Sequence, residues 1–238
     1  QRQMCIRDRR NSIDNPLYTR KGSQFMFSVA ATPPWSLWDG KDYKNMSDQD
    51  EAKFRMIEYH KWKFKAKIFS PLAPLTVKRT PVLMTRVEYG FLGSYNKYKK
   101  SPFETFYMGG DGMSGYSSTY ATETIGLRGY ENGSIAGNGG YNSYGYAYSR
   151  LSMELRYPFL LEPSSTIYGL VFVEAGNAWR DLKDFNPFQL KRSAGVGVRI
   201  FLPMIGLMGI DWAYGFDRPD GYDQRGGSNF HFIIGQEF

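Results

Sequence analysis

The chain has 238 residues, a formal net charge of +7 and a mean hydropathy of -0.48, and no stretch is long and apolar enough for a membrane-spanning helix. The positive charge is spread over many segments without the basic block typical of nucleic-acid binding, so we expect no nucleic-acid partner. The 18 Tyr, 17 Phe and 26 Gly instead suit strands with aromatic girdles and tight turns.

The beginning of the chain has an unusual composition. Cys5 is the only cysteine, which excludes an internal disulfide. The segment from Met4 to Asp8, MCIRD, resembles the translation of a sequencing-library adapter. We therefore expect residues 1–10 to be a non-native segment, and residues 11–238 to be the C-terminal portion of a barrel domain whose upstream strands are missing.

Apolar and polar residues alternate in many segments, which is the pattern of a strand with one apolar face. For example, Trp62 and Phe64 alternate with Lys63 and Lys65. The polar faces mix Lys, Arg, Glu, Asp and Gly, as the wet interior of a large barrel allows and the surface of a soluble sandwich rarely does. The pattern predicts eight strands, within residues 24–29, 61–68, 83–91, 150–157, 167–179, 193–200, 207–214 and 230–238.

The connections between these segments alternate between short turns and longer loops, as in outer-membrane barrels. The longest, Gly93–Ala147, carries apolar residues such as Phe106 and Ile125 that would be costly to expose to water. We expect this loop to fold into the lumen. The fold class is therefore all-β: an antiparallel transmembrane β-barrel, present here as an open, curved half-barrel with an inward-folded loop.

The last predicted strand has the clearest pattern. An apolar stripe that ends on an aromatic residue suits a strand that meets lipid and closes a barrel seam. A core strand of a soluble sandwich is the alternative. We expect one backbone edge of this strand to be unpaired. Its outward residues are Phe230, Phe232, Ile234 and Phe238, and its inward residues are His231, Ile233, Gly235 and Glu237.

The long loop contains the most specific motif, Leu127-Arg128-Gly129-Tyr130, which follows a Tyr-Met-Gly-Gly turn at 107–110. This combination resembles the signature of the BamA superfamily of outer-membrane assembly factors, whose loop carries a hydrophobic-Arg-Gly-aromatic tetrapeptide. Several late strands and the terminal aromatic residue fit the same family. The resemblance covers essentially residues 11–238.

The resemblance implies that Arg128 reaches into the lumen and pairs with acids on the two strands that follow, which here are Glu154 and Glu174. The sequence pattern agrees, because alternation turns Glu154 inward and Glu174 is the one charge in an otherwise apolar strand. An inward acid opposite a guanidinium avoids the cost of a charge facing lipid. Alternation also turns Asp211 and Arg199 inward, but their place in the network around Arg128 is less well supported than that of Glu154 and Glu174.

The implied function is an insertase that folds client proteins into the bacterial outer membrane without a cofactor or a covalent step. The last strand, with Phe230, Phe232, Ile234, Gly235 and Phe238, would form one lip of a lateral gate, and Gly235 would weaken it. The implied partners are outer-membrane lipids, unfolded β-barrel clients and accessory lipoproteins of an assembly complex. The barrel would cross the membrane many times, with its C-terminus on the periplasmic side.

One alternative remains open within the same superfamily, and two other classes of protein are less well supported. A sibling barrel, such as a TamA-like factor, a two-partner secretion translocator or a patatin-fusion barrel, shares the same loop motif, and only the sequence upstream of the barrel separates it. A small passive pore of eight strands does not explain the Arg128 loop, because so narrow a barrel could hardly admit it. An enzyme is not expected, because His60 and His231 lie on unrelated strands without the spacing of a metal site or a triad.

Overall fold

The chain forms one large antiparallel sheet. The computed structural model describes residues 4–47, 51–77, 79–112, 123–135, 144–162, 165–204 and 206–234. In space the sheet has the order β1-β2-β3-β4-β7-β8-β9-β10-β11. Its strands are β1 (Met4–Asn11), β2 (Gly22–Ala31), β3 (His60–Pro71), β4 (Val82–Gly93), β7 (Ala147–Glu162), β8 (Ser165–Trp179), β9 (Lys191–Leu202), β10 (Gly206–Gly215) and β11 (Gly227–Ile234).

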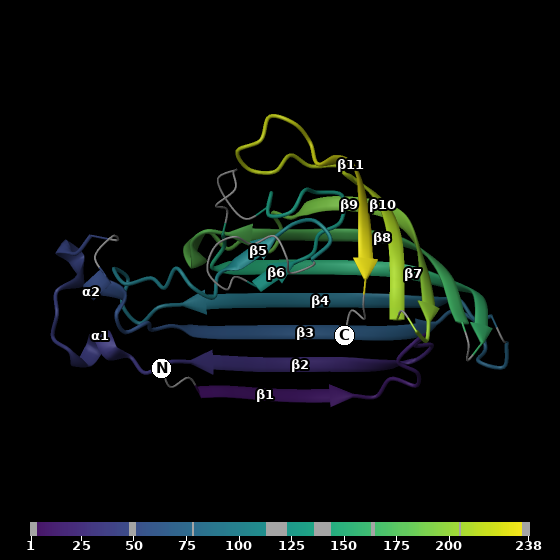
Figure 1. Cartoon of the computed structure of the whole chain (residues 1–238), viewed down its shortest axis with the longest axis horizontal. Coiled ribbons are helices and arrows are strands. Elements are labelled where there is room, and N and C mark those ends of the chain that lie inside the picture. The colour runs from purple at the N-terminus through teal and green to yellow at the C-terminus, as the bar shows by residue number, and fades with distance from the viewer. Residues whose placement is uncertain are drawn as a thin grey trace.

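The sheet is curved and open (Figure 1). Strands β1 to β4 run side by side, and β7 to β11 bend around the segment that carries β5 (Phe106–Met108) and β6 (Glu123–Ile125). Among the described residues, β1 pairs only with β2 and β11 pairs only with β10, so these strands are the two edges. The predicted all-β, open half-barrel with a long inward loop is confirmed.

All eight predicted strands are present, as β2, β3, β4 and β7 to β11, and β1 is an additional strand. Every residue of β1 is exposed, and its register with β2 runs from Met4 opposite Ala31 to Asn11 opposite Gln24. Backbone pairing to an open edge therefore holds this strand, and such pairing is tolerant of sequence. That residues 1–10 are non-native stays a prediction, which the upstream reading frame would test.

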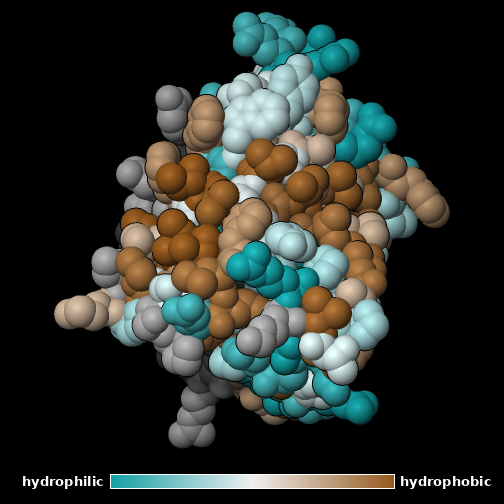
Figure 2. All heavy atoms as spheres, turned by 90° about the vertical axis from the view of Figure 1, so that its right-hand side faces the viewer, coloured by the Kyte–Doolittle hydropathy of each residue, from teal (hydrophilic) through white to brown (hydrophobic). Residues whose placement is uncertain are grey.

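The two faces of the sheet differ in chemistry, as alternation requires. On β3, Trp62 and Phe64 are exposed on the convex face, while Lys61 is buried on the concave face. Figure 2 shows a broad band of hydrophobic residues on the side of the molecule where β7 to β10 bend. The exposed apolar side chains of β7 to β10 include Met153, Leu155, Tyr157, Val171, Val173, Val196, Val198, Ile210 and Trp212. A face of this kind is solvated by lipid in a barrel.

Short turns and long connections lie at opposite ends of the strands. In the β1–β2 turn, the buried Tyr18 hydroxyl donates to the carbonyl oxygens of Thr80 and Arg156 at 3.1 and 3.2 Å, and its ring packs edge-on against Tyr168. Burial raises the pKa of the Tyr18 phenol. In the described residues, the helices of the long connections are all short: α1 (Trp35–Trp38), η1 (Tyr43–Asn45), α2 (Glu51–Phe54) and η2 (Leu182–Asp184). No helix in the described part of the chain is long and apolar enough to cross a membrane.

Strand β11 has the faces that the alternation predicts. Phe230, Phe232 and Ile234 are exposed, whereas His231 and Ile233 are buried. The remaining predicted residues of this strand, Gly235, Glu237 and Phe238, lie outside the described residues.

Candidate functional site

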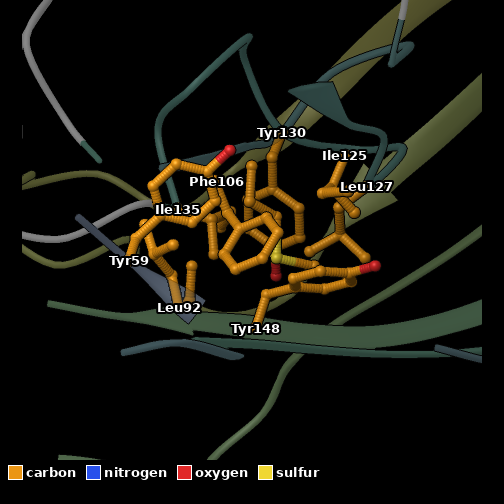
Figure 3. Close-up of a cluster of buried hydrophobic side chains, with 10 residues drawn as sticks. Tyr59, Leu92, Phe106, Ile125, Leu127, Tyr130, Ile135 and Tyr148 are labelled. Atoms are coloured by element: carbon orange, nitrogen blue, oxygen red, sulfur yellow. The ribbon is translucent and has the colours of Figure 1, made fainter. Parts of the chain in front are cut away.

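The connection between β4 and β7 packs against the concave face of the sheet through a buried apolar cluster (Figure 3). Phe106, Leu127 and Tyr130 come from the connection itself, whereas Leu92 and Tyr148 come from β4 and β7. The rings of Phe106 and Tyr148 meet edge-on with centroids 4.7 Å apart. Since all five side chains are excluded from solvent, their burial stabilises the packing of this connection against the concave face of the sheet.

Two backbone features set the conformation of the motif at 127–130. The Leu127 N–H donates to the Gly110 carbonyl at 3.0 Å, which joins the motif to the preceding Gly-Gly turn. Gly129 has a φ of +89°, and a Cβ at this position would lie 2.9 Å from the Gly215 nitrogen and 3.0 Å from the Ser193 Cβ. Only glycine fits a left-handed backbone pressed this closely against β9 and β10.

The Arg128 side chain is buried and contacts three strands. Its Nη2 lies 2.6 Å from Glu154 Oε1 on β7 and 2.7 Å from Glu174 Oε1 on β8. Its Nη1 lies 2.9 Å from Asp211 Oδ2 on β10. The Arg128 backbone N–H also donates to Glu174 Oε2 at 2.9 Å. Its guanidinium carbon lies 3.5 Å from the centroid of the Phe172 ring. The planar guanidinium donates from both of its Nη atoms, so it can bridge carboxylates that lie on separate strands.

Each of the three acids also has an arginine partner within the wall. Arg156 Nη2 lies 2.7 Å from Glu154, and Arg150 Nη2 lies 2.9 Å from Glu174. Arg199 donates to both carboxylate oxygens of Asp211. Loss of Arg128 would therefore not leave any of these carboxylates without a basic partner.

This network holds the loop in one position against the wall of the sheet. Burying a charged group is costly unless it is paired and hydrogen-bonded, and removing one partner of a buried pair costs roughly 3–5 kcal/mol. Arg128 meets this condition only when it sits between β7, β8 and β10, so its contacts define one docked position of the loop.

The same motif also contacts the last strand. The Gly129 N–H donates to Nε2 of His231 on β11 at 2.9 Å, and Asn229 Nδ2 donates to the Gly129 carbonyl at 3.1 Å. The Tyr130 hydroxyl donates to the Arg192 carbonyl on β9 at 2.6 Å. The motif at 127–130 thus contacts strands from β7 to β11.

The structure places the predicted residues Arg128, Glu154 and Glu174 together. Asp211, which was predicted to face inward but with less support as a partner, is a third direct partner of Arg128. His231 and Asn229 were not anticipated as contacts of the motif. Alternation turned His231 inward, but no sequence signal indicated how far along the strand the loop would reach.

Comparison with known proteins agrees with this architecture. The family model described as the Omp85 superfamily domain matches residues 8–238. The structure is similar to a crystal structure of BamA from Haemophilus ducreyi lacking POTRA domains 1-3, with a TM-score of 0.66 and 19% sequence identity. That similarity covers 97% of this chain but only 41% of the BamA chain. No curated protein matches the sequence significantly. The chain belongs to the Omp85 superfamily, and its fold is that of a C-terminal part of a BamA-like barrel.

Proposed function

We propose that the parent protein folds and inserts β-barrel proteins into the bacterial outer membrane, and that β11 is one lip of its lateral gate. In this mechanism, the exposed backbone N–H and C=O groups of β11 template the first strand of a client by β-augmentation. The client then leaves through the opened seam into the lipid. The steps are exchanges of hydrogen bonds and need no cofactor.

The observation that carries this proposal is the combination of an edge strand with a contact from the lumen. Strand β11 pairs with β10 alone among the described residues, and its Phe230 and Phe232 side chains are exposed on the outer face. From inside, the motif residue Gly129 bonds to His231 and Asn229 of the same strand. A loop that contacts the edge strand from inside can couple the state of the lumen to the state of the seam.

The proposal extends to orientation and partners. The short turns, including the one at Tyr18, would face the periplasm together with the C-terminus, and the long connections would face outward. The convex apolar face would contact outer-membrane lipids. Unfolded β-barrel clients would arrive through POTRA repeats upstream of this domain, with accessory lipoproteins of the assembly complex.

Reconstitution of the full-length parent in liposomes tests the mechanism. A urea-unfolded β-barrel client should fold faster with the parent than with empty liposomes, as measured by heat-modifiable electrophoretic mobility. A disulfide between β11 and the first strand of the complete barrel should abolish this acceleration, and reduction should restore it. The control variant carries its two cysteines on β10 and β11, which are already paired. A disulfide between these strands should leave the folding rate of the client unchanged.

A sibling transporter would behave differently. A translocator that uses the lumen should keep exporting its substrate with the seam disulfide closed, and should stop only when the lumen is blocked. Full acceleration with the seam crosslink completely formed would contradict the gate mechanism.

A further inference from the structure

A cavity of about 940 Å³ lies among the long connections and shares no residue with the Arg128 network. Its walls come from the β2–β3 connection with η1 and α2, the segment after β4, the segment before β7, and the β8–β9 connection. Its volume is within the range of sites that hold small ligands. The lining residues on which the ligand chemistry depends are Lys97, Tyr98, Lys100, Tyr146, Arg180 and Asp181.

The cavity is strongly basic. Its lining contains five basic side chains and two acidic ones, and one of the acids is already engaged, since Lys100 Nζ lies 2.9 Å from Asp181 Oδ2. Lys97 and Arg180 are exposed to solvent and are therefore accessible to a ligand. A concave site with excess positive charge favours an anion over a neutral or cationic ligand.

The cavity is also aromatic, and each ring lies close to a cation. Lys97 lies 4.9 Å from the Tyr98 ring centroid, and Lys100 lies 5.5 Å from that of Tyr146. Arg180 lies 5.4 Å from the Tyr144 ring, which itself meets Tyr146 edge-on at 6.0 Å. The face of an aromatic ring is electronegative and attracts the weakly positive C–H bonds of a sugar ring. Ring faces beside cations suit a ligand that carries both a sugar and a phosphate.

We infer that this cavity, which we name the loop cavity, binds a phosphorylated saccharide. Lys97, Lys100 and Arg180 contact the phosphates, and Tyr98 and Tyr146 pack against the sugar rings. Because the long connections are proposed to face outward, the cavity would open on the side of the membrane that carries the phosphorylated headgroups of outer-leaflet glycolipids. A free phosphorylated oligosaccharide has the same chemistry. The inference concerns a binding site and does not depend on insertase activity.

Calorimetric titration of the full-length parent in detergent tests the inference. The probe is a bisphosphorylated diglucosamine without acyl chains, and its dephosphorylated form is the comparison. We expect saturable binding of the phosphorylated probe and none of the dephosphorylated one. The variant K97Q/K100Q should weaken binding about tenfold, because it removes two charge-assisted contacts. The matched control K41Q/K183Q removes two exposed lysines of the same connections that do not line the cavity, and should bind like the parent.

A gain in affinity separates ligand contact from misfolding. Asp181→Asn removes the acid that pairs with Lys100, so it should tighten binding by about threefold. The source of the ligand is tested by repeating the titration in nanodiscs that contain the acylated glycolipid. Competition by the embedded lipid indicates a membrane headgroup, and undiminished binding of the soluble probe indicates a free saccharide.

Three results would overturn the inference. They are no saturable binding of the phosphorylated probe, equal weakening by the cavity and control variants, and equal competition by an acidic peptide such as polyglutamate. The last result would show that charge alone is recognised and would assign the cavity to an acidic protein segment.

Discussion

The backbone N–H of Gly129 lies 2.9 Å from Nε2 of His231, although the two residues are 102 positions apart in the sequence. This hydrogen bond joins the loop motif to the last strand and requires the His231 proton to reside on Nδ1. It is the most direct link between the loop inside the barrel and the edge where we propose that clients enter.

The His231 contact predicts a specific loss. His231→Phe keeps an aromatic ring but leaves the buried Gly129 N–H without its acceptor, which costs roughly 1–3 kcal/mol. We expect faster amide exchange in the peptide spanning Gly126–Tyr130, measured by mass spectrometry. His231→Gln supplies an amide oxygen as acceptor and should restore much of the protection. Identical exchange in the parent and the Phe variant would remove this link.

Arg128 is expected to matter more for activity than for stability. Arg128→Ala undocks the loop, but Glu154, Glu174 and Asp211 keep their own arginines, so the barrel wall should lose less than the roughly 3–5 kcal/mol of a broken buried pair. Client folding in liposomes should fall steeply while the parent's urea midpoint moves little. Arg128→Lys should be almost as inactive, since a compact ammonium lacks the two separated Nη donors with which the guanidinium reaches carboxylates on three strands. A large drop in the urea midpoint with normal client folding would contradict this assignment.

Gly129 should be intolerant of any side chain. Gly129→Ala combines a left-handed backbone with a Cβ only 2.9 Å from the Gly215 nitrogen, so we expect roughly 1–3 kcal/mol of strain and a displaced loop. Gly40→Ala is the matched control, because Gly40 has a φ of +62° and nothing within 4 Å of the added Cβ. Thermal unfolding of both variants separates backbone strain from steric clash. Equal shifts in the two would show that the close packing at Gly129 contributes nothing.

The connection between β10 and β11 should loosen in acid. The side chain of Arg192 donates to both oxygens of Asp217, at 3.0 and 2.9 Å, and holds the pKa of that carboxyl below its usual range. A carboxyl with a lowered pKa stabilises the folded state above its ordinary pKa of about 3.9, and this contribution disappears as the pH falls through the folded value. Asp217→Asn should therefore lower the Tm at pH 6. It should not lower the Tm at a pH below the pKa of Asp217 in the folded state, where this carboxyl is already protonated. Asp223→Asn, in the same connection, serves as the control.

The open edges predict self-association. The isolated chain in detergent should form dimers or larger species, because among the described residues β1 and β11 are each paired on one side only. Removal of residues 1–11 should not prevent this, since it only transfers the edge to β2. A strictly monomeric isolated chain, measured by sedimentation in matched-density detergent, would contradict the prediction.

The sequence by itself determined the strands and their faces. Successive side chains of a strand face opposite sides, with a period of two. In a strand such as the one with Trp62 to Lys65, the apolar side chains face lipid, so the polar ones must face the lumen. The same argument turned Glu154 and Asp211 inward. Strand β1 was not anticipated from the sequence, because its pairing with β2 depends on an available edge and not on an apolar stripe.

Only the tertiary structure decided which inward groups meet. Alternation gives a direction for each side chain but no height along the barrel, and the height depends on strand stagger and on where the loop docks. Arg128 therefore proved to bridge Asp211 on β10 as well as Glu154 and Glu174, and Gly129 proved to reach His231 on β11. These contacts lie up to 102 positions apart in the sequence. They arise because the sheet curls around the loop and brings distant strands to one buried guanidinium.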